Sequence, residues 1–140
     1  MITQELVEIW KDCKANFDNF KEMYAKNQSY VAARFAHRII FNQYASCAIL
    51  ANRVIRNGVR DEIISILDKI PEEFIVSKRL CSSYIEVNGS MMYIFAENVL
   101  NLKGRSTDLV YTTNLDIVAQ AVAPMSLLPD NDIPNLYVRN

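Results

Sequence analysis

The sequence predicts an α/β fold, a sheet flanked by helices, on three observations. Segments with apolar residues at helical spacing alternate with short β-prone runs, which is the order of elements in α/β domains. The run ASCAILA at residues 45–51 is continuous and mostly apolar, which is typical of a strand buried on both faces of a parallel sheet; periodicity alone leaves a helix as the alternative. Asn88-Gly89 lies between two β-prone runs, and this dipeptide favours a type I′ hairpin turn, in which both residues adopt positive φ.

The N-terminal part of the chain contains two predicted helices before the buried strand. Residues 3–25 form the first, with charged residues on one side and apolar residues three and four apart on the other: Leu6, Ile9, Trp10, Cys13, Phe17, Phe20 and Tyr24. Residues 30–42 form the second, whose inward-facing residues are Val31, Ala32, Phe35 and Ile39. The apolar run at residues 45–51 then follows as the first strand.

The C-terminal part contains the remaining helices and strands. A third helix is expected at residues 60–69, ended by Pro71 because proline cannot donate the next helical hydrogen bond. The two hairpin strands are expected at residues 83–87 and 90–95. The last predicted elements are a strand, a short helix and a strand, at residues 109–113, 117–125 and 136–138. No linker or repeat divides the 140 residues, so we expect one domain.

Composition and charge exclude several classes of protein. The chain is 51% apolar and 22% charged, which is a globular composition, and its net charge of -1 gives no overall attraction to nucleic acid. The N-terminus is charged and lacks the apolar core of a signal peptide, and no apolar run approaches the ~20 residues that span a bilayer, so we expect no membrane partner. Three dispersed cysteines and one histidine predict reduced thiols and no metal site.

Several short motifs occur together in the order and spacing of a known family. They are Phe35-Ala36-His37 with Phe41-Asn42, Ala48-Ile49-Leu50-Ala51, Ile70-Pro71-Glu72-Glu73-Phe74, Ile85-Glu86-Val87-Asn88-Gly89-Ser90 and Lys103-Gly104-Arg105-Ser106. Together they resemble the ATPase half of the large terminase subunits that package DNA in tailed phages. The resemblance implies a remodelled P-loop-ATPase-like sheet. It divides the chain into an added N-terminal helix (1–26), a terminase-like core (27–128) and a tail (129–140).

The resemblance also implies that the nucleotide site has been lost. Lys26, Asn27 and Gln28 occupy the positions of the family's Gly-Lys-Thr, and the chain has no glycine in its first 57 residues, so side chains block the close backbone approach to phosphates. Thr113 and Asn114 occupy the positions of the metal-binding Asp and the catalytic Glu, and an amide cannot act as a general base. We therefore expect no ATPase activity, no cofactor and no bound nucleotide or metal.

The N-terminal helix is a second departure from the family. The strand that leads into the phosphate loop should come directly before Lys26, yet residues 15–25 have a helical pattern. This helix is expected either to replace the missing strand or to cover the sheet edge that the strand left open.

Two groups of residues are candidate binding surfaces. Five arginines at helical spacing form a candidate phosphate-binding or nucleic-acid-binding patch: Arg34, Arg38, Arg53, Arg56 and Arg60. The alternative interpretation is a solvated face on which they pair with Asp61, Glu62 and Asp68. Tyr84 and Tyr93 are expected on one face of the hairpin, where they are candidates for a protein interface. The single histidine, His37, is expected to be a hydrogen-bonded core residue.

The expected function is that of a non-catalytic phage or prophage protein that binds and regulates a protein partner. That partner is a phage packaging component or a host factor, in the cytoplasm of an infected or lysogenic bacterium. The alternatives are a nucleic-acid-binding accessory that uses the arginines, a structural protein of the virion and, least favoured, an enzyme with a mechanism unrelated to the P-loop. A homodimer stays open, since an unpaired sheet edge or exposed Tyr84 and Tyr93 would favour one.

Overall fold

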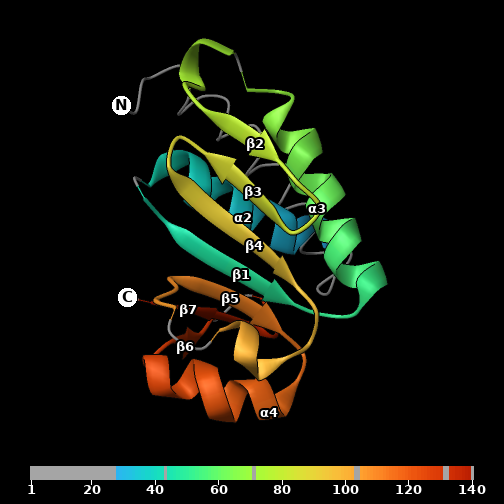
Figure 1. Cartoon of the computed structure of the whole chain (residues 1–140), viewed down its shortest axis with the longest axis vertical. Coiled ribbons are helices and arrows are strands. Elements are labelled where there is room, and N and C mark those ends of the chain that lie inside the picture. The colour runs from blue at the N-terminus through green and yellow to red at the C-terminus, as the bar shows by residue number, and fades with distance from the viewer. Residues whose placement is uncertain (1–27, 43, 71, 103–104, 131–132, 140) are drawn as a thin grey trace.

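A seven-stranded mixed sheet with helices on both faces forms the framework of the protein (Figure 1). The computed structural model describes residues 28–42, 44–70, 72–102, 105–130 and 133–139. In spatial order the strands are β2 (Lys78–Leu80), β3 (Tyr84–Val87), β4 (Ser90–Phe95), β1 (Ser46–Leu50), β5 (Leu109–Thr112), β7 (Leu136–Val138) and β6 (Leu128–Pro129). The predicted α/β fold is thereby confirmed.

The centre of the sheet is parallel and its two wings are antiparallel. β1 lies between β4 and β5 and is parallel to both, with Ala48 opposite Tyr93 on one side and Val110 on the other. Residues from Cys47 to Leu50 are completely buried, because helices cover both faces of this strand. The apolar run at residues 45–51 therefore contains the strand buried on both faces that the sequence favoured, and it is not helical.

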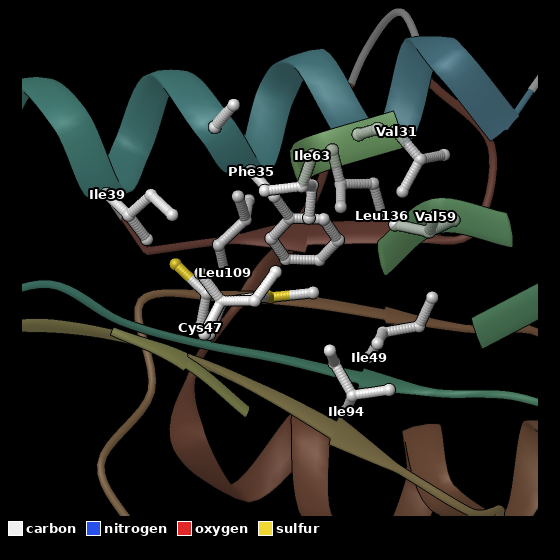
Figure 2. Packing of buried hydrophobic residues seen from close by; sticks show 14 of the residues in the cluster. Val31, Phe35, Ile39, Cys47, Ile49, Val59, Ile63, Ile94, Leu109 and Leu136 are labelled. Carbon is white, nitrogen blue, oxygen red and sulfur yellow. The ribbon is translucent and has the colours of Figure 1, made fainter. Parts of the chain in front are cut away.

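Helices α2 (Gln28–Phe41) and α3 (Arg53–Leu67) cover one face of the sheet. Figure 2 shows the ring of Phe35 between α2 and the strands, close to Cys47 and Ile63. The inward-facing residues predicted for α2 are all buried: Val31, Ala32, Phe35 and Ile39.

Helix α3 begins at Arg53 rather than at the predicted residue 60. Its first turn is stabilised by Asn52, whose Oδ1 accepts a hydrogen bond from the backbone N–H of Ile55 at 3.0 Å. Val59, Ile63 and Leu67 are spaced by four and are all buried against α2 and the sheet. The cap and this apolar stripe together explain the earlier start.

The opposite face is covered by short helical segments. These are η2 (Val99–Asn101) and a continuous run made of α4 (Leu115–Ile117), η3 (Val118–Val122) and η4 (Ala123–Met125). Ile117 and Val122 from this run pack on Ala48, Leu50 and Val110 in a second core cluster. The helix predicted at residues 117–125 is present, begins slightly earlier and includes one π-helical segment.

The hairpin and the edges complete the sheet. Asn88 and Gly89 have φ of 51° and 89°, as the hairpin prediction requires. The predicted last strand is β7, which is antiparallel to β5 and is followed in the sheet by β6. The edge strands β2 and β6 were not predicted, and neither was the short 3-10 helix η1 (Glu72–Phe74). Every residue of β2 is exposed, so no apolar alternation marks it in the sequence.

The N-terminal predictions concern residues that the structure does not describe. The helix at residues 3–25, its expected role beside the sheet, and Lys26 and Asn27 all lie outside the described part of the chain. Within that part, none of the helices is long and apolar enough to cross a membrane.

Candidate functional site

Open α/β sheets bind ligands at the carboxyl ends of their parallel strands, so this edge of the sheet is a candidate ligand site. Thr113 and Asn114 follow β5 at this edge. Asn114 caps α4: its Oδ1 accepts hydrogen bonds from the backbone N–H groups of Asp116 at 2.9 Å and Ile117 at 3.3 Å. Its Nδ2 lies 3.5 Å from Oε2 of Glu97. Asn114 is thus used by the local fold.

The remaining groups at this edge are similarly engaged. Asn52, directly after β1, caps α3. Arg56 donates from Nη1 to the carbonyl oxygen of Ala51 at 3.0 Å. Gln28 is the first residue of α2. The described residues of this edge therefore present caps and backbone contacts, and they contain no carboxylate held against a nucleophile.

Arg34 and Arg38, the two candidate arginines on α2, contact the wing of the sheet formed by β7 and β6. Nε of Arg34 lies 3.8 Å from Oδ2 of Asp130, which follows β6. Nη2 of Arg38 donates to the carbonyl oxygen of Arg139 at 3.5 Å, directly after β7. Arg38 Nε is buried and makes no hydrogen bond within the described residues.

The other three arginines lie on α3. Nε of Arg60 donates to the carbonyl oxygen of Cys81 at 2.9 Å, between β2 and β3, and its Nη1 contacts Asp61 at 3.3 Å. Arg53 is exposed, and Arg56 makes the backbone contact described above. Because β2 and β6 end the sheet on opposite sides, Arg60 and Arg34 point to opposite wings. The structure does not bring the five arginines together as one patch.

Tyr84 and Tyr93, in contrast, lie side by side on one face of the sheet. They are directly opposite each other in the register of β3 and β4. Their neighbours in the strands, among them Ile85, Met92 and Ile94, point the other way into the core beneath α2 and α3. In Figure 1 this face of β2, β3 and β4 is turned to the viewer, with α2 and α3 behind it. We call it the hairpin face; its residues are Arg79, Tyr84, Glu86, Met91, Tyr93 and Phe95.

The hairpin face is hollowed by a groove of about 330 Å³, lined by Ser77, Arg79, Tyr84, Glu86 and Met91. The carboxylate of Glu86 accepts hydrogen bonds from the hydroxyl of Ser77 and from the backbone N–H of Gly89, both at 2.9 Å. Asn88 Oδ1 accepts from the backbone N–H groups of Val76 at 2.8 Å and Ser77 at 3.1 Å. These contacts tie the groove wall to the hairpin turn, so its acceptors are already in use.

Arg105 lies at the border of the hairpin face, on top of two aromatic rings. Its guanidinium carbon is 4.4 Å from the ring centroid of Tyr93 and 5.2 Å from that of Phe95. The two rings are themselves stacked, with centroids 5.4 Å apart and an interplanar angle of 10°. Nε of Arg105 donates to the carbonyl oxygen of Asn101 at 2.9 Å. The guanidinium is thereby held in one orientation.

Sequence reasoning found the two tyrosines of this site and missed the other residues. Alternation along β4 would have added Met91 and Phe95 to Tyr93, since side chains two apart share a face. Arg79 lies on a strand that no pattern revealed. Arg105 comes from a segment between η2 and β5, where no periodicity indicates its direction. Its position over the rings is a purely tertiary contact.

Reactive groups elsewhere in the described residues do not form a second site. Burial raises the pKa of the Cys47 thiol to about 12, so it stays protonated and unreactive near neutral pH. Burial also raises the pKa of Tyr111. His37 is half-buried and its ring stacks on Phe41, with centroids 4.9 Å apart. Among the described residues, no three His, Cys, Asp or Glu side chains gather as metal ligands would.

No protein-family model matches this chain, and no curated protein matches it significantly. The function is therefore inferred from the geometry and chemistry of the hairpin face.

Proposed function

We propose that this protein is a non-catalytic binding module that engages a protein partner through the hairpin face. The observation that supports the proposal is the Tyr84–Tyr93 pair, which lies on the sheet face opposite α2 and α3. Both side chains are half-buried, and Tyr93 packs partly on the second core cluster. Tyrosine, phenylalanine, methionine and arginine are the residue types enriched in protein interfaces, and all four occur here. Their rings and thioether offer apolar area, while the phenol and guanidinium groups offer hydrogen bonds.

The state of the other groups favours binding over catalysis. Asn114, at the position where the terminase resemblance implies a catalytic Glu, caps a helix and cannot take up a proton. The buried Cys47 thiol is protonated at neutral pH and is therefore a poor nucleophile. The carboxylate of the hairpin face, Glu86, is bonded to Ser77 and to the Gly89 N–H of the turn.

The proposal also includes the evolutionary origin of the fold and the cell in which the protein acts. The parallel centre, with a strand, a helix and a hairpin in the order that the terminase resemblance implies, agrees with a remodelled P-loop-ATPase-like scaffold. On that view the protein is a phage or prophage product that acts in the cytoplasm of its bacterial host. Its partner is a component of the packaging machinery or a host factor.

Comparative affinity capture from phage-infected cells tests the proposal. Tagged wild type, Tyr84→Ala/Tyr93→Ala and the control Leu115→Ala are each used as bait, followed by quantitative mass spectrometry. Leu115 is 79% exposed on α4, on a different part of the surface. We expect one partner to be captured by the wild type and the control and to be lost with the tyrosine variant. Equal capture by all three baits contradicts the proposal.

The identity of the captured protein separates the remaining alternatives. Terminase or portal protein indicates regulation of packaging, whereas a single host protein indicates action on the host. Co-purification with assembled virions supports the structural alternative. The nucleic-acid alternative has no specific support, because Arg34 and Arg60 point to opposite wings of the sheet.

A further inference from the structure

Arg105 presents an oriented guanidinium at one border of the hairpin face. Its Nε is bonded to the carbonyl oxygen of Asn101, and its plane is held against Tyr93 and Phe95. Its two Nη groups have no hydrogen-bond acceptor among the described residues, and the residue is exposed. A guanidinium in a fixed plane loses little conformational freedom on binding, and its paired N–H groups match the two oxygens of a carboxylate.

Arg79 stands at the other border of the same face. It is exposed on the edge strand β2 and lines the groove, whereas Arg105 lies over β4, two strands away in the sheet. Glu86 is directly opposite Arg79 in the strand register, yet its carboxylate is bonded to Ser77 and Gly89. No salt bridge of Arg79 is present within the described residues. The face therefore has, at both borders, donors without an acceptor among the described residues, and the carboxylate of Glu86 is bonded to Ser77 and Gly89 rather than to Arg79.

We propose that the hairpin face recognises an acidic segment of its protein partner, with Arg105 and Arg79 binding carboxylates on either side of an apolar or aromatic side chain. The groove of about 330 Å³ beside Tyr84 and Met91 is the place for that side chain. The chemistry is complementary in charge, because a partner must supply acceptors for the two guanidinium groups. This inference rests on the proposed function and names the class of partner.

A single-stranded nucleic acid also combines anionic oxygens with planar groups, but the arrangement of the aromatic rings disfavours it. Binding of single strands relies on aromatic rings whose faces are open for base stacking. Here the guanidinium of Arg105 covers the rings of Tyr93 and Phe95.

Titration of the isotope-labelled full chain with defined probes tests the inference by NMR. The probes are acetyl-Glu-Leu-Phe-Glu-amide, the neutral acetyl-Gln-Leu-Phe-Gln-amide and a single-stranded oligothymidylate, each taken to millimolar concentration. We expect the acidic peptide to shift the Arg105 Nε–H resonance and the amides of β3 and β4, and to bind about tenfold more tightly than the neutral peptide, a difference of ~1.4 kcal/mol. Equal binding of the two peptides, stronger binding of the oligonucleotide, or no shift on the hairpin face overturns it.

Two variants separate recognition by the guanidinium from simple charge. Arg105→Lys keeps the charge but removes the paired N–H groups, so we expect most, but not all, of the preference for the acidic peptide to be lost, while Arg79→Gln weakens it less. Leu115→Ala is the matched control and keeps the full preference. The thermal midpoints of all variants are measured in parallel, to show that each chain is folded.

The outcomes also distinguish this inference from the function on which it rests. If capture of the cellular partner is lost with Tyr84→Ala/Tyr93→Ala but is unchanged with Arg105→Lys and Arg79→Gln, the hairpin face is an interface and the acidic-segment inference is wrong. If the tyrosine variant captures the partner normally, the proposed interface itself is wrong.

Discussion

The buried thiol of Cys47 allows a quantitative test of whether water is excluded from the core between α2 and the sheet. The side chain is 0% exposed in the cluster formed by α2, α3 and the sheet. Burial is the main reason that the pKa of this thiol rises to about 12; Arg38 opposes the rise and Asp108 adds to it. In the unfolded chain the same thiol ionises with a pKa of ~8.5. Between these two values the folded state keeps a proton that the unfolded state loses.

Stability is therefore expected to fall as the pH rises above ~8.5, because the unfolded state then binds fewer protons than the folded state. The slope approaches about 1.4 kcal/mol per pH unit, and linkage gives a loss of about 2 kcal/mol between pH 7 and pH 10 from this group alone. Below pH ~8.5 the thiol is protonated in both states, so its contribution does not change.

Urea unfolding at pH 7 and pH 10 measures this effect. Wild type is compared with Cys47→Ala, which lacks the thiol, and with Ile49→Val, a core substitution on the same strand that keeps it. The free energy of unfolding of the wild type and of Ile49→Val should decrease by about 2 kcal/mol more than that of Cys47→Ala. The same decrease in all three proteins would refute the reasoning and would mean that Cys47 is reached by water.

Three further substitutions test the packing, the helix cap and the hairpin turn. Phe35→Ala removes a completely buried ring and should cost about 3–5 kcal/mol in urea unfolding, whereas Val54→Ala, at a side chain 78% exposed, should change stability by less than ~0.5 kcal/mol. Asn52→Ala removes the cap of α3 and should cost about 1 kcal/mol, while Asn52→Asp, which keeps an acceptor, should cost much less; similar losses would contradict the cap. Gly89→Ala places a Cβ at φ +89° and 2.9 Å from the exposed ring of Tyr44, which can move, so the thermal midpoint should fall by the equivalent of about 1 kcal/mol.

The sequence alone was sufficient for the elements whose signals are local. The spacing of Val31, Phe35 and Ile39 predicted α2, the run at residues 45–51 predicted a strand buried on both faces, and Asn88-Gly89 predicted the hairpin. Alternation along the hairpin strands also placed Tyr84 and Tyr93 on one face. Each of these features depends on residues close in the chain, which is why it can be predicted without a fold.

Other features depend on contacts that no local sequence pattern reveals. β2 is a strand because β3 supplies its hydrogen bonds, and its three exposed residues have no pattern of their own. The helical spacing of the five arginines predicted neighbours within each helix, but the packing of α2 and α3 decided that Arg34 and Arg60 point to opposite wings. Arg105 lies between η2 and β5, and its guanidinium contacts the rings of Tyr93 and Phe95 on β4. This contact at the border of the hairpin face depends on tertiary structure, which the local sequence does not determine.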